Sequence, residues 1–406
     1  MADAPRRRVA ILVHAIFPGD PRIRRQSDAL ADAGYEVDII CLREPGEPAE
    51  ERDGPVRIVR LPINRSFIGF AGHMLEYLAF TAAAGWRLAR EHRRRRYDLV
   101  QVATVPDFLS FAALPEKLTG VPLLLDLHED MPEFSRDRFA SRALRPLQPV
   151  VDAATRASAA IADELITVHE PLRLLSIGRG VAPERISVVM NSADGRLFDP
   201  SRHERRPFMA DGTLRLIHHS NFQRIYGLDV AIEGLSRVRA DLPWRLDVHG
   251  DGPWRPAIEA AIERTATAGR VTLHGRTAMD DLPALLADAD IGLVPSLPEP
   301  YLEYSLSTKL LEYAAMGVPT IASDLATFRH YFDDAALRYV PGGDPDALAR
   351  TLEAMADDPA GTVAMGQEAR RQAAGYDWDH QKERYLAIVQ RLVGGRDAGR
   401  RGRTIP

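Results

Sequence analysis

Short apolar runs alternate with amphipathic stretches along nearly the whole chain. A first set of strand-like runs lies at 9–14, 36–42, 56–61, 98–102, 122–127, 164–168 and 186–190. A second set lies at 214–219, 244–249, 271–274, 290–294, 319–322 and 337–340. Between the runs, apolar residues recur at helical spacing over 22–33, 70–92, 141–162, 227–239, 254–268, 280–288, 307–316, 346–356 and 361–373. Strands that alternate with helices predict an α/β fold with parallel, doubly wound sheets.

The alternation is interrupted near the middle of the chain. The segment 193–213 is rich in Asp, Pro, Gly and Arg and has no periodicity, which is typical of a linker. The predicted order is a Rossmann-like domain over 1–192, the linker 193–213, a second Rossmann-like domain over 214–375, a helix over 376–393 and a disordered basic tail over 394–406. Two such domains place a cleft between the carboxyl ends of their strands, where ligands bind in these sheets.

Composition narrows the class of protein. The 406 residues are 45% hydrophobic and 27% charged, as in globular proteins, and the net charge of −5 gives no general attraction to nucleic acid. Cys41 is the single cysteine, which excludes an internal disulfide and suits a reducing compartment. The first apolar run lacks a signal-peptide cleavage site, and no stretch has the length of a membrane-spanning helix. We therefore expect a cytoplasmic protein.

The stretch S-L-S-T-K-L-L-E-Y-A-A-M-G at 305–317 carries the most specific chemistry. It follows the apolar run I-G-L-V-P, so its helix begins at the end of a strand, and unpaired N–H groups and the helix dipole attract phosphate there. Ser305, Ser307, Thr308 and Lys309 add donors and a positive charge at this end. Glu312, one turn further on, can accept two hydrogen bonds from a ribose diol. Each residue also has an ordinary use, as an N-cap, a solvated lysine or a surface ion pair. Their coincidence at a strand-to-helix turn favours a nucleoside-diphosphate site.

The segment Y-S-L-S-T-K-L-L-E-Y-A-A-M-G-V-P-T-I-A-S-D resembles the nucleotide-sugar-binding segment of the GT-B retaining glycosyltransferases of family four. In this resemblance Glu312 matches the glutamate that binds the ribose. A second glutamate of the family pattern would fall on Tyr304, and Glu303 lies beside it. Either residue is a candidate for contacts to the transferred sugar.

Other segments extend the resemblance over nearly the whole chain. The turn P-G-D-P is similar to the family's glycine turn near the donor phosphate and places Gly19 there, and H-G-D-G-P places Gly250 in the corresponding turn of the second domain. V-T-L-H-G-R, with Gly275 and Arg276, is similar to the segment that contacts the base. The final helix resembles the segment that crosses back to the first domain. The resemblance implies two Rossmann-like domains facing across a cleft, the GT-B arrangement.

One motif departs from the family pattern. The family places an Arg and a Lys as G-R-x-x-x-x-K-G after the first strand of the second domain, whereas this chain has S-N-F-Q-R-I-Y-G. Asn221 and Tyr226 stand at the two positions. Arg224 is then the predicted cation for the diphosphate, with a solvated loop arginine as the alternative.

The resemblance implies a retaining transfer of a sugar from a UDP- or GDP-type nucleotide sugar to a hydroxyl acceptor in a polysaccharide, a glycolipid or a metabolite. We expect no cofactor and no metal, because the amino end of the helix at Ser307–Lys309 and Arg224 would stabilise the leaving diphosphate. Asp288-Ala-Asp290 matches the metal-binding pattern Asp-x-Asp in sequence, but it lies between a predicted helix and a predicted strand. We therefore expect Asp288 to be a surface residue and Asp290 a turn residue. His128, in L-L-L-D-L-H-E-D, is expected to donate a hydrogen bond or carry a proton near the sugar or acceptor, or else to be a loop residue.

Three alternatives stay open. A GT-B sugar-nucleotide epimerase would need no acceptor, and a non-catalytic sugar-nucleotide-binding module would release no product. The apolar, aromatic stretch 65–96 ends in R-R-R-R and is either an internal helix with a solvated end or a peripheral contact with the inner membrane surface. The sequence does not specify the base, the sugar, the acceptor, the linkage or the oligomeric state.

Overall fold

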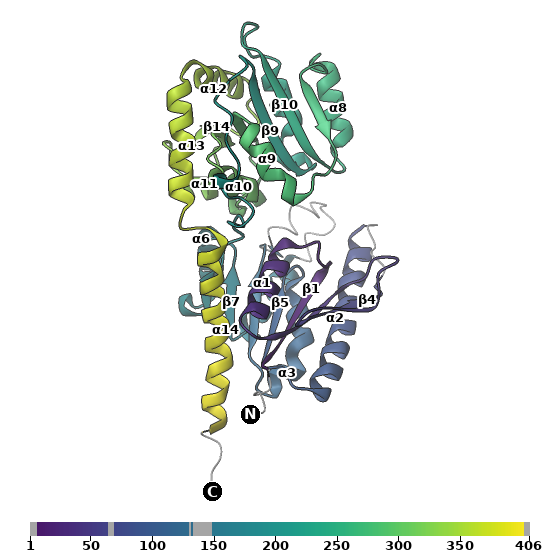
Figure 1. Cartoon of the computed structure of the whole chain (residues 1–406). Helices are drawn as coiled ribbons and strands as arrows, with labels where there is room; N and C mark the ends of the chain where they lie inside the picture. Colours follow the sequence, from purple (N-terminus) through teal and green to yellow (C-terminus); the bar gives the residue numbers. More distant parts are fainter. Residues whose placement is uncertain (1–5, 64–68, 130, 133–147, 402–406) are drawn as a thin grey trace. The chain divides into compact units, whose positions relative to one another are not determined.

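A computed structural model describes residues 6–63, 69–129, 131–132 and 148–401 (Figure 1). The chain divides into two compact units. The first unit holds the residues up to Asn191 and those from Gln381 onward, and the second holds Ser192–His380. The segment expected to be a linker belongs to the second unit, where Phe198 is buried and Asp290 accepts a hydrogen bond from the Met209 N–H at 3.0 Å.

Within the described residues, the first unit contains an eight-stranded sheet in the order β3-β4-β2-β1-β5-β6-β7-β8. The strands are β1 Arg8–Ile16, β2 Glu36–Leu42, β3 Glu50–Asp53, β4 Val56–Leu61, β5 Leu99–Ala103, β6 Leu123–Leu127, β7 Glu164–Thr167 and β8 Ile186–Val188. All neighbours are parallel except β3 and β4, which pair antiparallel. The helices are α1 Pro21–Asp32, α2 Gly69–Arg94, α3 Leu114–Leu118, α5 Gln148–Ile161, α6 Glu170–Gly178 and α14 Trp378–Arg401, with short 3-10 turns η1 Asp107–Ala113 and η3 Pro183–Arg185. The residues of α14 before Gln381 belong to the second unit.

The second unit contains a six-stranded sheet in the order β11-β10-β9-β12-β13-β14, with all neighbours parallel. The strands are β9 Leu214–Asn221, β10 Trp244–Asp251, β11 Val271–His274, β12 Ile291–Val294, β13 Thr320–Ser323 and β14 Arg338–Val340. The helices are α7 Leu228–Leu235, α8 Arg255–Arg264, α9 Leu282–Asp288, α10 Thr308–Ala315, α11 Ala326–Tyr331, α12 Pro345–Asp357 and α13 Pro359–Ala373. The strand order reverses between β9 and β12, which defines the switch point where such sheets bind ligands.

Every strand expected from the apolar runs is present in the structure. The runs are buried on both faces of the sheets, so they read as continuous apolar segments rather than as alternating ones. The sequence pattern missed β3, because Glu50–Asp53 is exposed and charged and pairs only with β4 at the edge. It also missed the short helices α3, α6 and α11. The first part of the helix expected over 141–162 lies outside the described residues.

Helix α14 packs on the first unit through side chains along its first half. Gln381 Oε1 accepts the Met190 N–H at 3.0 Å, and the Tyr385 hydroxyl donates to Gln101 Oε1 at 2.6 Å. The helix does not end at residue 393, as the sequence pattern suggested, but runs on to Arg401. The expectation of disorder from residue 394 is therefore wrong up to Arg401. Gly394 and Gly395 lower the helix propensity, but they keep their backbone hydrogen-bonding groups and so do not end the helix. Residues 402–406 lie outside the described residues.

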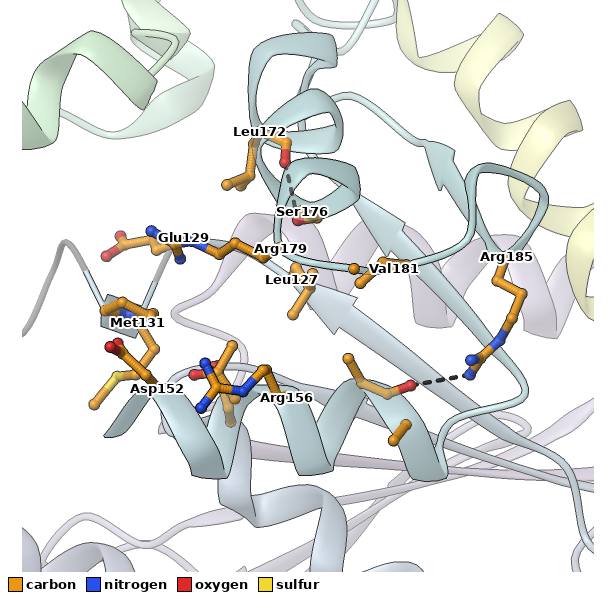
Figure 2. Close-up of a pocket in the computed structure, with 16 residues that line it drawn as sticks. Leu127, Glu129, Met131, Asp152, Arg156, Leu172, Ser176, Arg179, Val181 and Arg185 are labelled. Atoms are coloured by element: carbon orange, nitrogen blue, oxygen red, sulfur yellow. Dashed lines mark hydrogen bonds between the residues drawn. The ribbon is translucent and has the colours of Figure 1, made fainter. Parts of the chain in front are cut away.

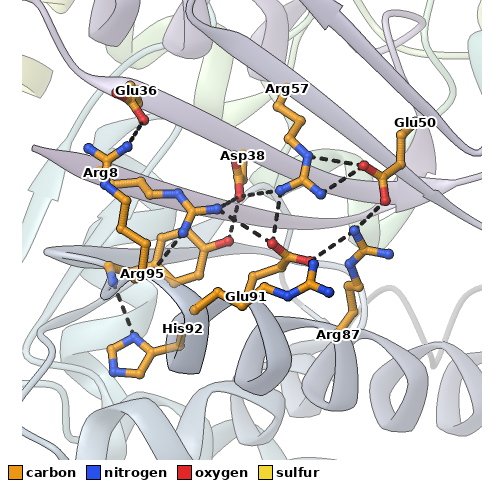
Figure 3. A network of polar contacts seen from close by, with 11 residues as sticks. Arg8, Glu36, Asp38, Glu50, Arg57, Arg87, Glu91, His92 and Arg95 are labelled. Atoms are coloured by element: carbon orange, nitrogen blue, oxygen red, sulfur yellow. Dashed lines mark hydrogen bonds and ion pairs between the residues drawn. The ribbon is translucent and has the colours of Figure 1, made fainter. Parts of the chain in front are cut away.

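A buried ionic network attaches α2 to the amino ends of β1, β2 and β4 (Figure 3). Arg57 contacts Glu91 at 2.9 Å, and the Tyr97 hydroxyl donates to Asp38 at 2.6 Å. Arg8 also pairs with Asp38. Part of the basic run lies in this network, since Arg95 pairs with Glu36 and Arg94 contacts Glu91 at 3.4 Å.

The middle of α2 presents different residues on two faces. Phe80, Ala84 and Leu88 are buried in the core of the first unit. Leu75 and Trp86 are 70% and 64% exposed. The internal-helix alternative for 65–96 describes the buried face, and contact with a membrane surface stays a prediction. In the described part of the chain, no helix combines the length and hydropathy needed to cross a membrane.

Candidate active site

Helix α10 begins beside the switch point of the second sheet. Its N-cap, Ser307, has extended backbone and makes no side-chain capping hydrogen bond, so the first turn keeps donors for another partner. The helix can approach the sheet because β12 carries Gly292, where a Cβ atom would lie 2.5 Å from the ring of Tyr313. The buried Tyr313 therefore fixes α10 against β12, and the amino end of α10 lies on the carboxyl side of the sheet.

Lys309 lies in the first turn of α10 and is only 7% exposed. Its Nζ donates to Ser307 Oγ at 3.3 Å and lies 4.4 Å from the centroid of the Tyr226 ring. Burial lowers the pKa of Lys309 to about 8, although the charge of Glu312 acts in the opposite direction. Lys309 forms no ion pair with any of the described residues. A buried ammonium group therefore adjoins a helix N-terminus, and no carboxylate neutralises it by contact.

Glu312 lies one turn into α10 and is also 7% exposed. Its Oε2 is 3.1 Å from His219 Nε2 on β9. The two atoms are not aligned for a hydrogen bond, and neither has a hydrogen-bond partner in the described part of the chain. A buried carboxylate that keeps acceptor capacity is costly unless a ligand uses it.

The carboxyl ends of the adjacent parallel strands β9 and β10 approach each other closely. Gly250 has φ +143°, and a Cβ atom there would lie 1.9 Å from the Ser220 carbonyl oxygen, so only glycine allows the strand ends to approach. Asn221 is the exposed last residue of β9 and lies opposite Asp251. Gly275 accepts the Gly250 N–H at 3.0 Å, but a side chain there would meet nothing within 4 Å. Arg276 beside it is exposed.

Five other predicted donor residues have protein contacts or solvent exposure in the structure. Arg224 is paired with Glu299 at 2.6 Å and its side chain is 49% exposed. Glu303 accepts the Ala326 N–H at 3.1 Å and so caps the start of α11. Tyr304 is exposed, Thr308 is exposed, and Ser305 is partly buried. The structure therefore brings Ser307, Lys309 and Glu312 together most closely, with Tyr226 and His219 facing them.

Two buried histidines next to this site were not predicted. His218 has Nδ1 2.9 Å from the Leu293 carbonyl and Nε2 2.8 Å from Ser220 Oγ, and burial and the nearby Lys309 charge lower its pKa well below the usual value. His249 contacts Thr277 Oγ1 at 2.8 Å and stacks on His274 with ring centroids 4.4 Å apart. The signal available in the sequence was the polar H-H-S-N and H-G-D at the ends of two otherwise apolar strands.

The Asp-x-Asp of the second unit lies at the opposite, amino end of β12. Asp290 accepts the Arg215 backbone N–H at 2.8 Å, and its carboxylate forms an ion pair with Arg206. The Asp288 carboxylate forms an ion pair with the Arg215 guanidinium. Both carboxylates thus bind this unit's own arginines. Among the described residues, no group of three or more His, Cys, Asp or Glu side chains is arranged to hold a metal ion.

In the first unit, Gly19 and His128 occupy two strand ends. Gly19 lies in the turn after β1, and Asp20 next to it caps α1 by accepting the Arg22 N–H at 2.9 Å. Burial opposes ionisation of Asp20, but the Arg22 charge and hydrogen bonds hold its pKa well below the usual range. His128 follows β6 and is buried, with Nε2 3.1 Å from Asp126 Oδ2. Asp126 also accepts from Gln26 at 2.8 Å, so His128 belongs to a buried polar cluster.

A cavity of about 290 Å³ lies in the first unit between α5, α6 and the end of β6 (Figure 2). Leu127 and Glu129, on either side of His128 in the chain, contribute to its lining. Arg156 and Arg179 bring positive charge and Asp152 negative charge. Sequence reasoning missed this cavity, because its lining comes from segments far apart in the chain.

Two family models match consecutive parts of the chain. "Glycosyl transferase 4-like domain" covers residues 19–192 and "Glycosyl transferases group 1" covers residues 213–358. The chain is 26% identical over 402 residues to the 2-deoxystreptamine glucosyltransferase of Streptomyces kanamyceticus, covering 92% of this chain and 98% of the relative. It is 28% identical over 414 residues to the D-inositol 3-phosphate glycosyltransferase of Kineococcus radiotolerans, covering 91% and 89%.

Solved structures share the fold. Sucrose-phosphate synthase from Thermosynechococcus elongatus matches with a TM-score of 0.75 and 20% identity, covering 96% of this chain and 100% of that one. Anabaena HepE in complex with UDP and glucose matches with a TM-score of 0.67 and 16% identity, covering 95% and 99%. The fold is the GT-B type, with two Rossmann-like parallel-sheet domains. The chain belongs to the group 1 family of glycosyltransferases.

Proposed function

We propose that this glycosyltransferase takes its sugar from a nucleoside-diphosphate donor and binds the nucleotide at the amino end of α10. The observation that carries the proposal is the pair of buried, opposite charges one turn apart, Lys309 and Glu312. A diphosphate fits the ammonium and the free N–H groups, and a ribose diol fits the carboxylate. The solved complexes of HepE with UDP, UDP and glucose, and UDP-glucose support a nucleotide sugar as the donor.

We propose that transfer retains the anomeric configuration and needs no metal ion. The bond between the sugar's anomeric carbon and the diphosphate oxygen breaks, and the acceptor hydroxyl oxygen bonds to that carbon on the same face. The acceptor proton passes to a phosphate oxygen of the leaving group. Lys309 and the α10 dipole would stabilise the negative charge that develops on the diphosphate. Retention is implied by the resemblance to family four, and metal independence by the cationic character of this site.

The acceptor is proposed to be a hydroxyl group on a polysaccharide, a glycolipid or a small metabolite. The names of several relatives specify cyclitol acceptors, 2-deoxystreptamine and D-inositol 3-phosphate. This makes small polyols the first acceptors to test. An epimerase would isomerise the donor without any acceptor, and a binding module would leave the donor intact. A transferase would form a glycoside only when the acceptor is present.

The donor site is tested by thermal unfolding with a panel of UDP-, GDP- and TDP-sugars. At least one donor should raise the unfolding temperature, because a ligand that binds only the folded state stabilises it. Glu312→Ala and Glu312→Gln should abolish that shift. Glu259→Ala, which removes an exposed carboxylate on α8, should keep it. A full shift in both Glu312 variants would exclude the ribose assignment.

A further inference from the structure

We propose that Tyr226 is a positioning residue that holds the Lys309 ammonium group in the diphosphate subsite. The inference rests on the proposed function and adds a residue to its machinery. Its central observation is the 4.4 Å distance between Lys309 Nζ and the centroid of the Tyr226 ring. An aromatic face attracts an ammonium group at this distance without neutralising its charge.

The loop that carries Tyr226 is fixed against the end of β12. Tyr226 is the last residue of the 3-10 turn η5 Arg224–Tyr226. The next residue, Gly227, has φ +59°, and a Cβ atom there would lie 2.2 Å from the Pro295 carbonyl oxygen. The Leu297 N–H donates to the Ile225 carbonyl at 2.8 Å. The ring is thus presented by a backbone that has little freedom to move.

The charged and titratable groups around Lys309 leave its positive charge available. Glu312 lies on the same helix and His218 on β9, and both act on the Lys309 site electrostatically. His219 on β9 faces Glu312 at 3.1 Å. Arg224, the cation of the Tyr226 loop, contacts Glu299 at 2.6 Å instead. Lys309 is therefore the cation that the Tyr226 ring orients. The loop S-N-F-Q-R-I-Y-G has a tyrosine at position 226, where the family pattern has a lysine, and Lys309 of α10 supplies the positive charge instead.

The test is calorimetric titration of UDP, GDP and TDP into the full-length protein and its variants, at several pH values below and above 8. Tyr226→Phe keeps the ring and should bind within about twofold of the wild type. Tyr226→Leu keeps the apolar volume but removes the attraction for the cation, and should weaken binding by about 3- to 30-fold. In the Leu variant the pH above which affinity falls should also move down, because the charged form of Lys309 is less favoured. If the role of Tyr226 were purely structural, Tyr226→Leu would weaken binding but would not change the pH above which affinity falls.

The outcomes separate this inference from the proposed function. Lys309→Met should weaken nucleotide binding more than Tyr226→Leu. If Lys309→Met weakens binding and Tyr226→Leu binds like the wild type at every pH, the positioning role is wrong and the donor site stands. If Tyr226→Phe loses as much affinity as Tyr226→Leu, the hydroxyl and not the ring is needed, and the inference is overturned. If Lys309→Met binds all three nucleotides like the wild type, the proposed donor site itself fails.

Discussion

At the scale of single residues, the site combines charges that are expensive to bury. Lys309 is 7% exposed and its pKa is lowered from 10.5 to about 8, which corresponds to roughly 3 kcal/mol of disfavoured charge in the folded state. The proposed function accounts for this cost, because a bound diphosphate would offset it.

Lys309→Met is expected to stabilise the nucleotide-free protein by about 1 to 3 kcal/mol near pH 7 while weakening nucleotide binding. The sign follows from the lowered pKa, because the unfolded chain binds the proton more tightly than the folded one. The difference in the free energy of unfolding between the variant and the wild type should be largest below pH 8. It should vanish as the pH rises towards 10.5.

Denaturant unfolding at a series of pH values measures the stability difference. Lys382→Met provides the control, because its ammonium forms an exposed pair with Asp32 at 2.9 Å. That control should change stability by less than about 0.5 kcal/mol at all of these pH values. A destabilised Lys309→Met variant at pH 7 would show that the lysine is structural.

The sequence predicted some site residues and not others, for a physical reason. Ser307, Lys309 and Glu312 lie within six consecutive residues at the start of one predicted helix. Their spacing alone therefore predicts that their side chains lie near one another. The pairing of Arg224 with Glu299 and the contact of Tyr226 with Lys309 join residues far apart in the chain. Such contacts depend on how β9 and β12 lie side by side, which local patterns do not specify.

At the scale of elements, α2 carries an apolar surface that nothing in the described structure covers. Leu75, Leu78 and Trp86 recur on one exposed face, and Arg90 lies over the Trp86 ring at 5.4 Å. Arg90, Arg93 and Arg96 form no ion pair with any residue that the structure describes. An apolar stripe that ends in unpaired arginines complements an anionic membrane surface.

We therefore expect the protein to sediment with vesicles that contain phosphatidylglycerol and not with vesicles of phosphatidylcholine alone. Trp86→Ser combined with Leu78→Ser should weaken this binding, because both side chains would enter the interface. Leu118→Ser is the matched control, since Leu118 is 86% exposed on α3 of the same unit. Equal sedimentation with both kinds of vesicle, or none with either, would contradict a role for α2 at anionic membranes.

At the scale of the whole molecule, the repeated alternation of strands and helices was sufficient to predict two doubly wound sheets. Apart from the antiparallel pair β3 and β4, the order of strands within each sheet follows from right-handed crossovers and a single reversal point. The composition of 193–213 suggested a linker, but the segment belongs to the second unit, where its polar residues have protein partners, as the Arg206–Asp290 pair illustrates. Polarity alone does not distinguish a solvated segment from one whose polar groups have protein partners.

The proposed donor site requires that a nucleoside diphosphate bind at the first turn of α10. A crystal structure of the protein with UDP, or with whichever of UDP, GDP and TDP binds most tightly, would show where the diphosphate lies. We expect phosphate oxygens within hydrogen-bond distance of Lys309 Nζ and the N–H groups that follow Ser307, and the ribose hydroxyls on Glu312. Phosphates bound elsewhere, with Lys309 still directed only at Tyr226 and Ser307, would contradict it.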